Sequence, residues 1–564
     1  MPEERKTIEA RLSASPEVYH MARFEKAFPW LLAGGAALVL LETYRKNTND
    51  RAKANADIKA ALKNQEHQTE VLKEQIRQFD ENAFKERKAE RRERYTKAVE
   101  QLGNASAPVR MGGVYTLIGL ADEWLLDENL DYTEKVREGQ VIINSLCAYI
   151  RSSFALAFHY DELTQESPTA EGLYKNREQD FYIDKAEFKS EADIRLSIIK
   201  EIHDRLQSPE INTPGAWSDF EYDFSGSTFF YPIDFTRSYY AKPVNFSGSA
   251  YQDEVRFGGS TYQGGADFSG SIYRRGADFL SSTYQSQANF SRSTYQDKAV
   301  FSSSTYQDGA NFSGSTYQGE VFFRGSVYQD WVVFNGSTYR EEADFCGSTY
   351  RRGADFSDST YWGKIVFGGS VYQGWAVFRD SAYRGEAAFN DSVYWGGADF
   401  SGSTYRGRTG FGNSIYQEGA NLSRSTYWGE ADFSGSIFCS EIYFGYGTHS
   451  DSFSRFIGCT PQFYDETNHK NTLFGSNNNN FTVENSRGYP IYRSFEGLPL
   501  RCCFLAEAQE EYLSGIFKEI EETREKLLTT ERFQEKIGLP GKLRAFNTAL
   551  HEWREKVTTA QRTR

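Results

Sequence analysis

The side chains best suited to catalysis or metal binding are few and scattered. The six cysteines form no C-x-x-C pair and no regular spacing, so the sequence predicts neither a disulfide framework nor a zinc site; they are Cys147, Cys346, Cys439, Cys459, Cys502 and Cys503. The seven histidines are dispersed, and no G-x-S-x-G, H-E-x-x-H or Walker motif is present. We therefore predict a protein that is not an enzyme and that binds no metal or cofactor. An enzymatic activity would have to reside in the unassigned C-terminal region.

Five tryptophans that follow tyrosines of a regular repeat are the candidate contact residues. They are Trp331, Trp362, Trp375, Trp395 and Trp428. Exposed tryptophan is enriched where protein partners dock, so these side chains form a possible protein-contact surface. The alternative is that they pack over the backbone of nearby corners.

An eleven-residue repeat positions these tryptophans and dominates the chain. Phenylalanine recurs every eleven residues from Phe224 to Phe433, with Leu422 as the one exception. A second aromatic residue, nearly always tyrosine, follows five residues later, and a serine precedes that residue by two positions in every copy. A small apolar residue usually precedes phenylalanine by two positions, so that one unit reads A-D-F-S-G-S-T-Y-Q-G-G. Self-similarity at a fixed period of this kind is typical of solenoids.

The spacing within the repeat predicts the geometry of one coil. Residues two apart share a face of an extended strand, so Ala-x-Phe and Ser-x-Tyr each point one small and one large side chain inward. Corners of two and three residues separate these pairs, and their glycines suit tight corners. We predict that two repeats, about 22 residues, close a four-sided coil, because a coil of a single repeat would leave almost no interior for its two rings. Ten coils at about 4.8 Å would form a rod about 48 Å long. A buried phenol needs a partner, so we expect the tyrosine hydroxyls to reach the serines or water near the three-residue corners.

The repeat resembles the pentapeptide-repeat family, whose unit is A-(D/N)-L-x-x. The similarity is carried by Ala266–Gly270, Ala277–Phe279, Ala310–Gly314, Ala398–Gly402 and Ala420–Leu422. In addition, Arg94–Gly103 and Val109–Leu117 resemble the helical leader of bacterial membrane-anchored pentapeptide-repeat proteins. These resemblances imply a four-sided right-handed β-helix, a bacterial origin and an anchor before the leader. The chain departs from the family in two ways. Its central position holds Phe or Tyr, and its successive aromatic residues are alternately five and six residues apart.

The N-terminal part predicts a membrane anchor followed by helices. Residues 1–26 form an N-terminal segment, and residues 27–44 form a predicted single-pass transmembrane helix whose uncharged run, Ala27–Leu41, spans about 22 Å as a helix. A buried core helix or a signal-peptide segment is the alternative. Residues 45–103 predict a charged helical stalk of coiled-coil character, through which the chain could self-associate. Residues 104–212 predict a small helical domain.

The whole fold is therefore predicted to be mainly a β-solenoid, at residues 213–450, flanked by α-helical N- and C-terminal regions. Residues 451–564 predict an irregular segment and C-terminal helices that either cap the open end of the solenoid or bind a partner. The chain has a net charge of −14, and its segment 244–443 has a net charge of −6. This mild acidity does not favour direct nucleic-acid binding.

Two functions from different classes follow from these features. The first is a non-enzymatic, membrane-anchored scaffold that presents a β-helical rod to an unknown protein partner, with the repeat region in the cytoplasm. The alternative is a DNA mimic that inhibits a topoisomerase or another DNA-processing enzyme, as some pentapeptide-repeat proteins do. Arginines such as Arg274, Arg351 and Arg406 would interrupt the continuous negative stripe that a DNA mimic needs.

Overall fold

A computed structural model of the chain describes residues 51–446, 449–529 and 533–559. The predicted N-terminal segment 1–26 and the predicted transmembrane helix 27–44 lie outside the described residues. The chain divides into two units, residues 1–93 and 94–564. Among the described residues, no single helix has both the length and the apolar composition needed to cross a bilayer. One bent pair, Tyr132–Arg151 with Ala155–Leu163, reaches that composition when its two parts are taken together.

The predicted charged stalk is a long helix, α3 (Arg51–Leu102), which begins in the first unit and ends in the second. Its sequence contains neither proline nor glycine, so nothing interrupts its backbone hydrogen bonds. The apolar residues Leu62, Ile76 and Phe79 of its predicted seam are more than half exposed in the single chain. Pairing of two such helices remains a prediction.

A small helical domain follows within the second unit. It consists of α4 (Ala107–Leu126), α5 (Tyr132–Arg151), the 3₁₀ turn η1 (Ala155–His159), α6 (Tyr160–Leu163) and α7 (Glu178–Leu206). Its core contains a buried ion pair in which Arg195 Nε lies 2.8 Å from Glu191 Oε1. The guanidinium of Arg195 also donates to the carbonyl of Ile150 at 2.8 Å, which compensates part of the cost of burying the charge.

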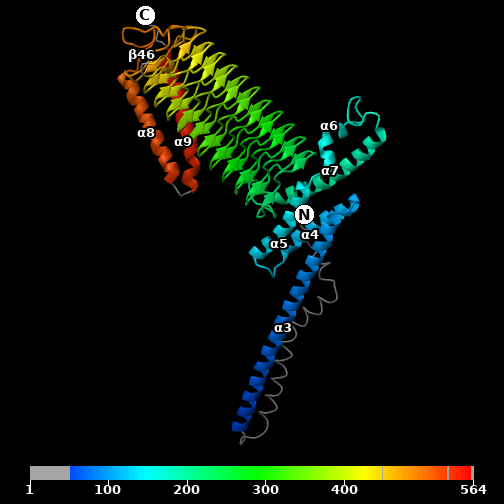
Figure 1. Cartoon of the computed structure of the whole chain (residues 1–564). Helices are drawn as coiled ribbons and strands as arrows, with labels where there is room; N and C mark the ends of the chain where they lie inside the picture. The colour runs from blue at the N-terminus through cyan, green and yellow to red at the C-terminus, as the bar shows by residue number, and fades with distance from the viewer. Residues whose placement is uncertain (1–50, 447–448, 530–532, 560–564) are drawn as a thin grey trace. The chain divides into compact units, whose positions relative to one another are not determined.

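The repeats form a parallel β-solenoid with four sides, in which each strand pairs with the strand two repeats away in the sequence (Figure 1). Sheet A contains β1 (Tyr222–Asp223), β5 (Val244–Asn245), β9 (Ala266–Asp267), β13 (Ala288–Asn289), β17 (Ala310–Asn311), β21 (Val332–Val333), β25 (Gly353–Asp355), β29 (Trp375–Val377), β33 (Ala398–Asp399), β37 (Ala420–Asn421) and β41 (Ile442–Tyr443). Sheet B contains β2 (Thr228–Phe229), β6 (Ala250–Tyr251), β10 (Ile272–Tyr273), β14 (Thr294–Tyr295), β18 (Thr316–Tyr317), β22 (Thr338–Tyr339), β26 (Thr360–Tyr361), β30 (Ala382–Tyr383), β34 (Thr404–Tyr405), β38 (Thr426–Tyr427) and β42 (Arg455–Phe456).

The other two sides complete each coil. Sheet C contains β3 (Ile233–Asp234), β7 (Val255–Arg256), β11 (Ala277–Asp278), β15 (Ala299–Val300), β19 (Val321–Phe322), β23 (Ala343–Asp344), β27 (Ile365–Val366), β31 (Ala387–Ala388), β35 (Thr409–Gly410) and β39 (Ala431–Asp432). Sheet D contains β4 (Tyr239–Tyr240), β8 (Thr261–Tyr262), β12 (Thr283–Tyr284), β16 (Thr305–Tyr306), β20 (Val327–Tyr328), β24 (Thr349–Tyr350), β28 (Val371–Tyr372), β32 (Val393–Tyr394), β36 (Ile415–Tyr416), β40 (Ile437–Phe438), β45 (Leu473–Phe474) and β46 (Cys503–Phe504). The predicted coil of two repeats, about 22 residues, is thus confirmed.

Stacked aromatic rings fill the interior, as the spacing predicts. Within one column, Phe268 and Phe290 lie 4.9 Å apart between ring centroids and are nearly parallel. The two phenylalanine columns meet edge to face, with Phe279 and Phe290 at 5.1 Å and 81°. The tyrosine columns flank them, and Tyr284 meets Phe290 at 5.7 Å and 86°. Both arrangements are favourable for aromatic pairs, so the columns stabilise each other along and across the rod.

The serine before each tyrosine connects neighbouring coils. Ser304 Oγ accepts from the backbone N–H of Ser282 at 3.2 Å and donates to the carbonyl of Phe279 at 3.2 Å. The serine hydroxyl thus bonds the backbone of the preceding coil twice. Most of the tyrosine hydroxyls, including that of Tyr306, are buried and make no hydrogen bond of ordinary geometry with the described residues. That they bond to water stays a prediction. Burial raises the pKa of Tyr306 well above its ordinary value, and the nearby hydroxyl of Ser304 offsets part of this shift.

The two-residue corners have a left-handed residue at their second position in every repeat from 226 to 435. Glycine occupies many of these positions, such as Gly336 with φ 65°. Other corners place arginine, serine, aspartate or asparagine there, as at Arg292 and Asn413. The backbone conformation is therefore set by the coil, and a residue other than glycine adopts it at a cost of about 1 kcal/mol.

The helical domain closes the first end of the solenoid. Arg151 of α5 lies 2.9 Å from Asp223 of β1, and the amide of Gln140 donates to the carbonyl of Glu221 at 2.8 Å. Phe188 of α7 packs on Phe230 at 5.0 Å between ring centroids. These contacts cover the edge strands of the first coil, which would otherwise be free to pair with another chain.

The solenoid continues beyond residue 450, which corrects the predicted boundary. Phe456, Phe463 and Phe474 stack on Tyr427, Phe433 and Phe438, so the inner columns extend through a coil with longer corners. The antiparallel strands β43 (Tyr464–Asp465) and β44 (Lys470–Asn471) lie in one such corner, and the 3₁₀ turn η2 (Ser450–Ser452) precedes it. Inserted residues break the sequence period without displacing the rings from their columns.

Two C-terminal helices lie along one side of the solenoid (Figure 1). These are α8 (Glu507–Thr529) and α9 (Phe533–Thr558), which pack against each other and against sheet D. The predicted C-terminal helices are therefore present. They cover a side of the rod as well as following its last strand, β46.

Candidate interaction surfaces

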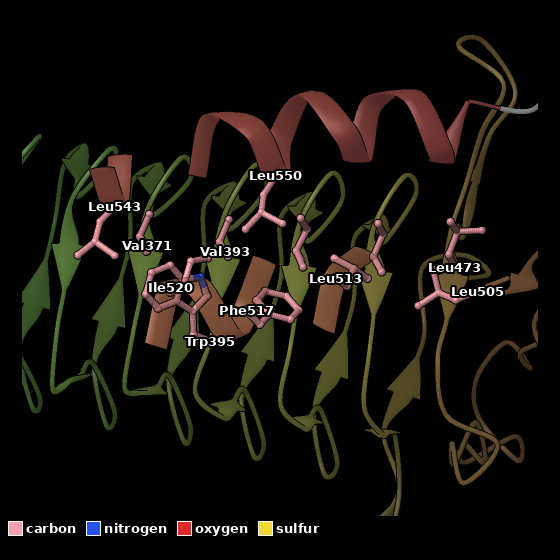
Figure 2. Packing of buried hydrophobic residues seen from close by; sticks show 12 residues of the cluster. Val371, Val393, Trp395, Leu473, Leu505, Leu513, Phe517, Ile520, Leu543 and Leu550 are labelled. Carbon is pink, nitrogen blue, oxygen red and sulfur yellow. The ribbon is translucent and has the colours of Figure 1, made fainter. Parts of the chain in front are cut away.

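The outward residues of sheet D explain where the C-terminal helices bind. In the first coils these residues include Thr261, Thr283 and Thr305, but from residue 371 onward the same column is apolar. Val371, Val393, Ile415, Ile437 and Leu473 form a buried cluster with residues of α8 and α9 such as Leu513, Phe517, Ile520, Leu543 and Leu550 (Figure 2). The change from threonine to valine and isoleucine is visible in the sequence only when alternate repeats are read separately.

Trp395 belongs to this intramolecular cluster, which corrects its assignment to a protein-contact surface. Its side chain is 6% exposed and packs beneath the helices (Figure 2). The first residue after tyrosine points to solvent in most coils, but at this coil α8 covers it. Trp395 therefore stabilises the attachment of the C-terminal helices and is not available to a partner.

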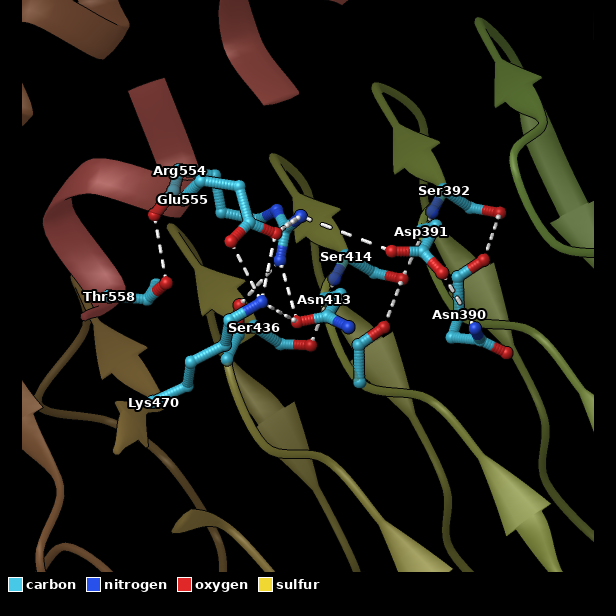
Figure 3. Close-up of polar contacts among 12 residues, drawn as sticks. Asn390, Asp391, Ser392, Asn413, Ser414, Ser436, Lys470, Arg554, Glu555 and Thr558 are labelled. Carbon is cyan, nitrogen blue, oxygen red and sulfur yellow. Dashed lines mark hydrogen bonds and ion pairs between the residues drawn. The ribbon is translucent and has the colours of Figure 1, made fainter. Parts of the chain in front are cut away.

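A polar network also attaches α9 to the solenoid. Arg554, which is 2% exposed, donates to Asn413 Oδ1 at 2.8 Å and to the carbonyl of Gly435 at 3.2 Å (Figure 3). Lys470 Nζ lies 2.7 Å from Glu555. Although burial opposes it, the hydrogen bond from Lys470 and the charge of Arg554 lower the pKa of Glu555. Because these charges are paired and partly buried, loss of one partner would leave another without compensation.

The remaining four tryptophans are exposed but do not form one surface. Trp331 and Trp375 belong to the corner between sheets D and A, whereas Trp362 and Trp428 belong to the corner between sheets B and C. In a four-sided coil these two corners are diagonally opposite. The predicted contact residues therefore divide between two separate edges of the rod.

The indoles of Trp331 and Trp375 lie over glycines of the following coil. A Cβ placed on Gly353 would lie 2.3 Å from Cζ3 of Trp331, and one on Gly397 would lie 2.9 Å from Cζ3 of Trp375. The indoles thus contact corner backbone, which is the alternative that the sequence left open. They nevertheless remain 40% and 61% exposed.

The outward aspartates and asparagines before phenylalanine have a structural role that the sequence analysis missed. The side chains of Asp267, Asn311 and Asp399 each accept a hydrogen bond from the backbone N–H two residues later, at 3.0–3.1 Å. This is the Asx turn, which closes the two-residue corner. The preference for aspartate or asparagine at this position follows from the corner, because both side chains present the required oxygen.

No reactive or metal-binding arrangement is present among the described residues. They contain no group of three or more histidine, cysteine, aspartate or glutamate side chains that could hold a metal ion. Burial raises the pKa of Cys147, Cys439 and Cys502 to about 12, so these thiols are poor nucleophiles at neutral pH. A cavity of about 550 Å³ lies between α8 and sheet D, and its lining includes Cys439, Glu510 and Ser514. Burial and the charge of Glu510 both raise the pKa of the Cys439 thiol, so Cys439 stays protonated at neutral pH.

Comparison of the chain with protein-family models, with curated proteins and with solved structures gives no match. The geometry of the surfaces themselves is therefore the basis for assigning a function.

Proposed function

We propose that the chain is a non-enzymatic, membrane-anchored scaffold whose β-solenoid presents its outer surface to protein partners. In this proposal residues 27–44 form the anchor, the repeat region lies in the cytoplasm, and α3 provides the stalk, through which two copies could associate. We also propose that the solenoid belongs to the pentapeptide-repeat family, with aromatic residues in the central slots.

The closure of the rod by the chain's own helices is the observation that carries this proposal. The helical domain packs on the first coil through contacts such as Arg151 with Asp223. The helices α8 and α9 cover one side near the other end. The helical domain thus protects the strand edges of the first coil, and α8 and α9 cover the outer face of sheet D. Sheets A, B and C remain as the surfaces on which a partner can bind.

The use of the outward carboxylates makes DNA mimicry the weaker function. A DNA mimic needs carboxylates free to imitate phosphates, whereas Asp267 and Asp399 hold corner N–H groups. Arg324 further pairs with Asp344 at 2.5 Å. These contacts occupy negative groups within the rod itself.

Site-specific photo-crosslinking in native membranes tests the scaffold function. A photoreactive residue at Thr338 would stand on the open side of sheet B, where Thr338 is partly exposed. The matched control is Val393, which occupies the corresponding position before tyrosine but is buried beneath α8 and α9. We expect a discrete crosslinked protein from Thr338 and none from Val393.

Two results would contradict the proposal. If crosslinking from Thr338 yields no partner above the Val393 background, the proposed scaffold function is contradicted. If the full chain is recovered in the soluble fraction without detergent, the proposed membrane anchor is contradicted.

A further inference from the structure

One edge of the solenoid carries a short motif that the fold does not require. In four consecutive coils the corner between sheets B and C begins with Trp362, Arg384, Arg406 and Trp428, and each of these residues is followed by glycine. We call these four residues the tryptophan–arginine edge. Their backbone N–H groups each donate to the carbonyl of a tyrosine in the preceding coil at 2.7–2.8 Å. They are therefore spaced about 4.8 Å apart over about 14 Å.

The same corner position elsewhere shows that arginine and tryptophan are not structural necessities. Glutamine occupies it at Gln296 and Gln318 of the same edge, and at Gln285, Gln307 and Gln329 of the diagonally opposite edge. These coils have the same backbone pairing and the same stacked tyrosines. The residues of the tryptophan–arginine edge are thus free to serve another purpose.

The side chains of this edge are exposed, and one pair of them is held in place. Trp362 and Trp428 are 50% and 53% exposed. The guanidinium of Arg384 lies 3.6 Å from the ring centroid of Trp362, a cation–π contact that orients both groups. The following glycines fix the backbone, since a Cβ on Gly385 would lie 2.3 Å from the carbonyl oxygen of Gly363 in the preceding coil. A rigid presentation of this kind lowers the entropic cost of binding.

The charges of this edge favour an anionic partner. Within the described residues, no carboxylate lies within 4.0 Å of the guanidinium of Arg384 or Arg406. The four corners contain Lys364, Arg384, Arg406 and Arg408 against Glu386 and Glu430, and Arg408 already pairs with Glu430 at 3.6 Å. The four corners therefore carry more positive than negative charge within a chain whose net charge is −14. The adjoining corner of the preceding coil holds Arg340, Glu341 and Glu342, so the positive part of this edge ends beside Trp362.

We propose that the tryptophan–arginine edge is the docking site for a short acidic segment of a partner protein. This inference rests on the proposed scaffold function and specifies its partner. An extended segment with a carboxylate at every second residue presents negative charges about 6.7 Å apart on one face, and four or five residues span the edge. The two tryptophans would flank that segment with apolar contacts, and tryptophan and arginine are the residues that dominate binding energy at protein interfaces. A nucleic acid fits less well, because the acidic surface beyond this short edge would repel a long polyanion.

Binding of a designed peptide to the full-length chain tests the proposal. The probe is a fluorescein-labelled peptide of about eight residues that alternates glutamate and alanine, and its control replaces glutamate with lysine. We expect fluorescence anisotropy to show binding of the glutamate peptide that weakens with added salt, and no binding of the lysine peptide. The double variant Arg384→Gln/Arg406→Gln should weaken binding about tenfold, and Trp362→Gln/Trp428→Gln at least about threefold.

A matched variant separates this site from general electrostatics. Arg352→Gln/Arg424→Gln removes the same charge from arginines that already lie 3.6 and 4.0 Å from a carboxylate. This variant should bind the peptide within about twofold of the unchanged chain. Glutamine occupies the equivalent corner position in other coils, at Gln296 and Gln318, so the test variants should fold and their circular dichroism should be unchanged.

Three outcomes would overturn the inference. They are no binding of the glutamate peptide, equal binding by the Arg384→Gln/Arg406→Gln variant and the unchanged chain, and tighter binding of an oligothymidylate than of the peptide. The scaffold function is tested separately. If crosslinking from Thr338 still captures a protein while the peptide does not bind, the scaffold stands and the assignment of its docking edge fails.

Discussion

The buried tyrosine hydroxyls provide a quantitative test of the interior packing. Tyr306 is stacked between Tyr284 and Tyr328 at 4.8 and 4.9 Å, and its hydroxyl has no hydrogen-bond partner among the described residues. A buried hydroxyl without a partner costs about 1–3 kcal/mol. Replacing Tyr306 with phenylalanine removes this cost and leaves the ring stack in place. We therefore expect Tyr306→Phe to stabilise the solenoid by about 1 kcal/mol after the small loss of packing.

A second buried tyrosine supplies the matched control. Tyr222 is 1% exposed, and its hydroxyl donates to the carbonyl of Trp217 at 2.9 Å. Tyr222→Phe removes that hydrogen bond and leaves the carbonyl unpaired, so it should destabilise the protein by about 1–2 kcal/mol. The two substitutions delete the same atom from the same residue type, and they should shift stability in opposite directions.

Urea denaturation of the full-length chain in mild detergent, followed by near-ultraviolet circular dichroism, measures both effects. The midpoint of the transition should rise for Tyr306→Phe and fall for Tyr222→Phe. A fall of about 1 kcal/mol or more for Tyr306→Phe would refute the reasoning, because it would mean that this hydroxyl is hydrogen-bonded in the folded protein.

Three further predictions test other parts of the fold. Burial raises the pKa of the core tyrosines above the value of about 10 that they have when unfolded, so their contribution to stability should be constant below about pH 10 and fall as the pH rises above it. Tyrosinate absorbance should appear together with unfolding, and its appearance in the folded protein would contradict the buried columns. Gly336 has a φ of 65°, and no atom lies within 4 Å of a methyl group added there, so Gly336→Ala should lower stability by about 1 kcal/mol through backbone strain alone. The control Gly276→Ala should be neutral. Thermal melting curves that shift equally for the two variants would argue against the left-handed corner. Phe345→Asp should cost at least about 4 kcal/mol of stability, because it places an unpaired charge in a ring column. Asp344→Ala should cost about 1–2 kcal/mol, because it removes the partner of Arg324. Denaturation midpoints in the reverse order would contradict the assignment of inner and outer positions.

The inner half of the fold could be predicted from the sequence because each inner position accepts only a few residue types. Phenylalanine, tyrosine, serine and alanine recur where a two-residue strand and a fixed corner leave space for a ring or a small side chain, so the period fixes the coil. The outer half could not be predicted in this way. Outer residues such as Asp344 respond to local partners, and Asp344 is 5% exposed because Arg324 pairs with it.

The candidate surface was predicted only in part for a related reason. One coil contains two eleven-residue repeats, so opposite corners of the coil have the same place in the repeat. The repeat alone therefore does not separate Trp362 and Trp428 from Trp331 and Trp375, which lie on a different edge. It also conceals the apolar column that α8 and α9 cover, and with it the burial of Trp395. After Phe444, inserted corners of variable length remove the period, although the rings of Phe456 and Phe474 continue their columns.

The distance between two outward threonines tests the two-repeat coil most directly. Thr294 and Thr404 both lie in sheet B, and the strand register joins them through five steps, by way of Thr316, Thr338, Thr360 and Ala382. Spin labels can be attached at the two positions through a non-canonical amino acid, so that the native cysteines remain. Pulsed electron paramagnetic resonance should then report a backbone separation of about 24 Å, broadened by the label arms. A separation of about 48 Å would mean one coil for every single repeat, and it would contradict the arrangement of the aromatic columns and of every surface derived from it.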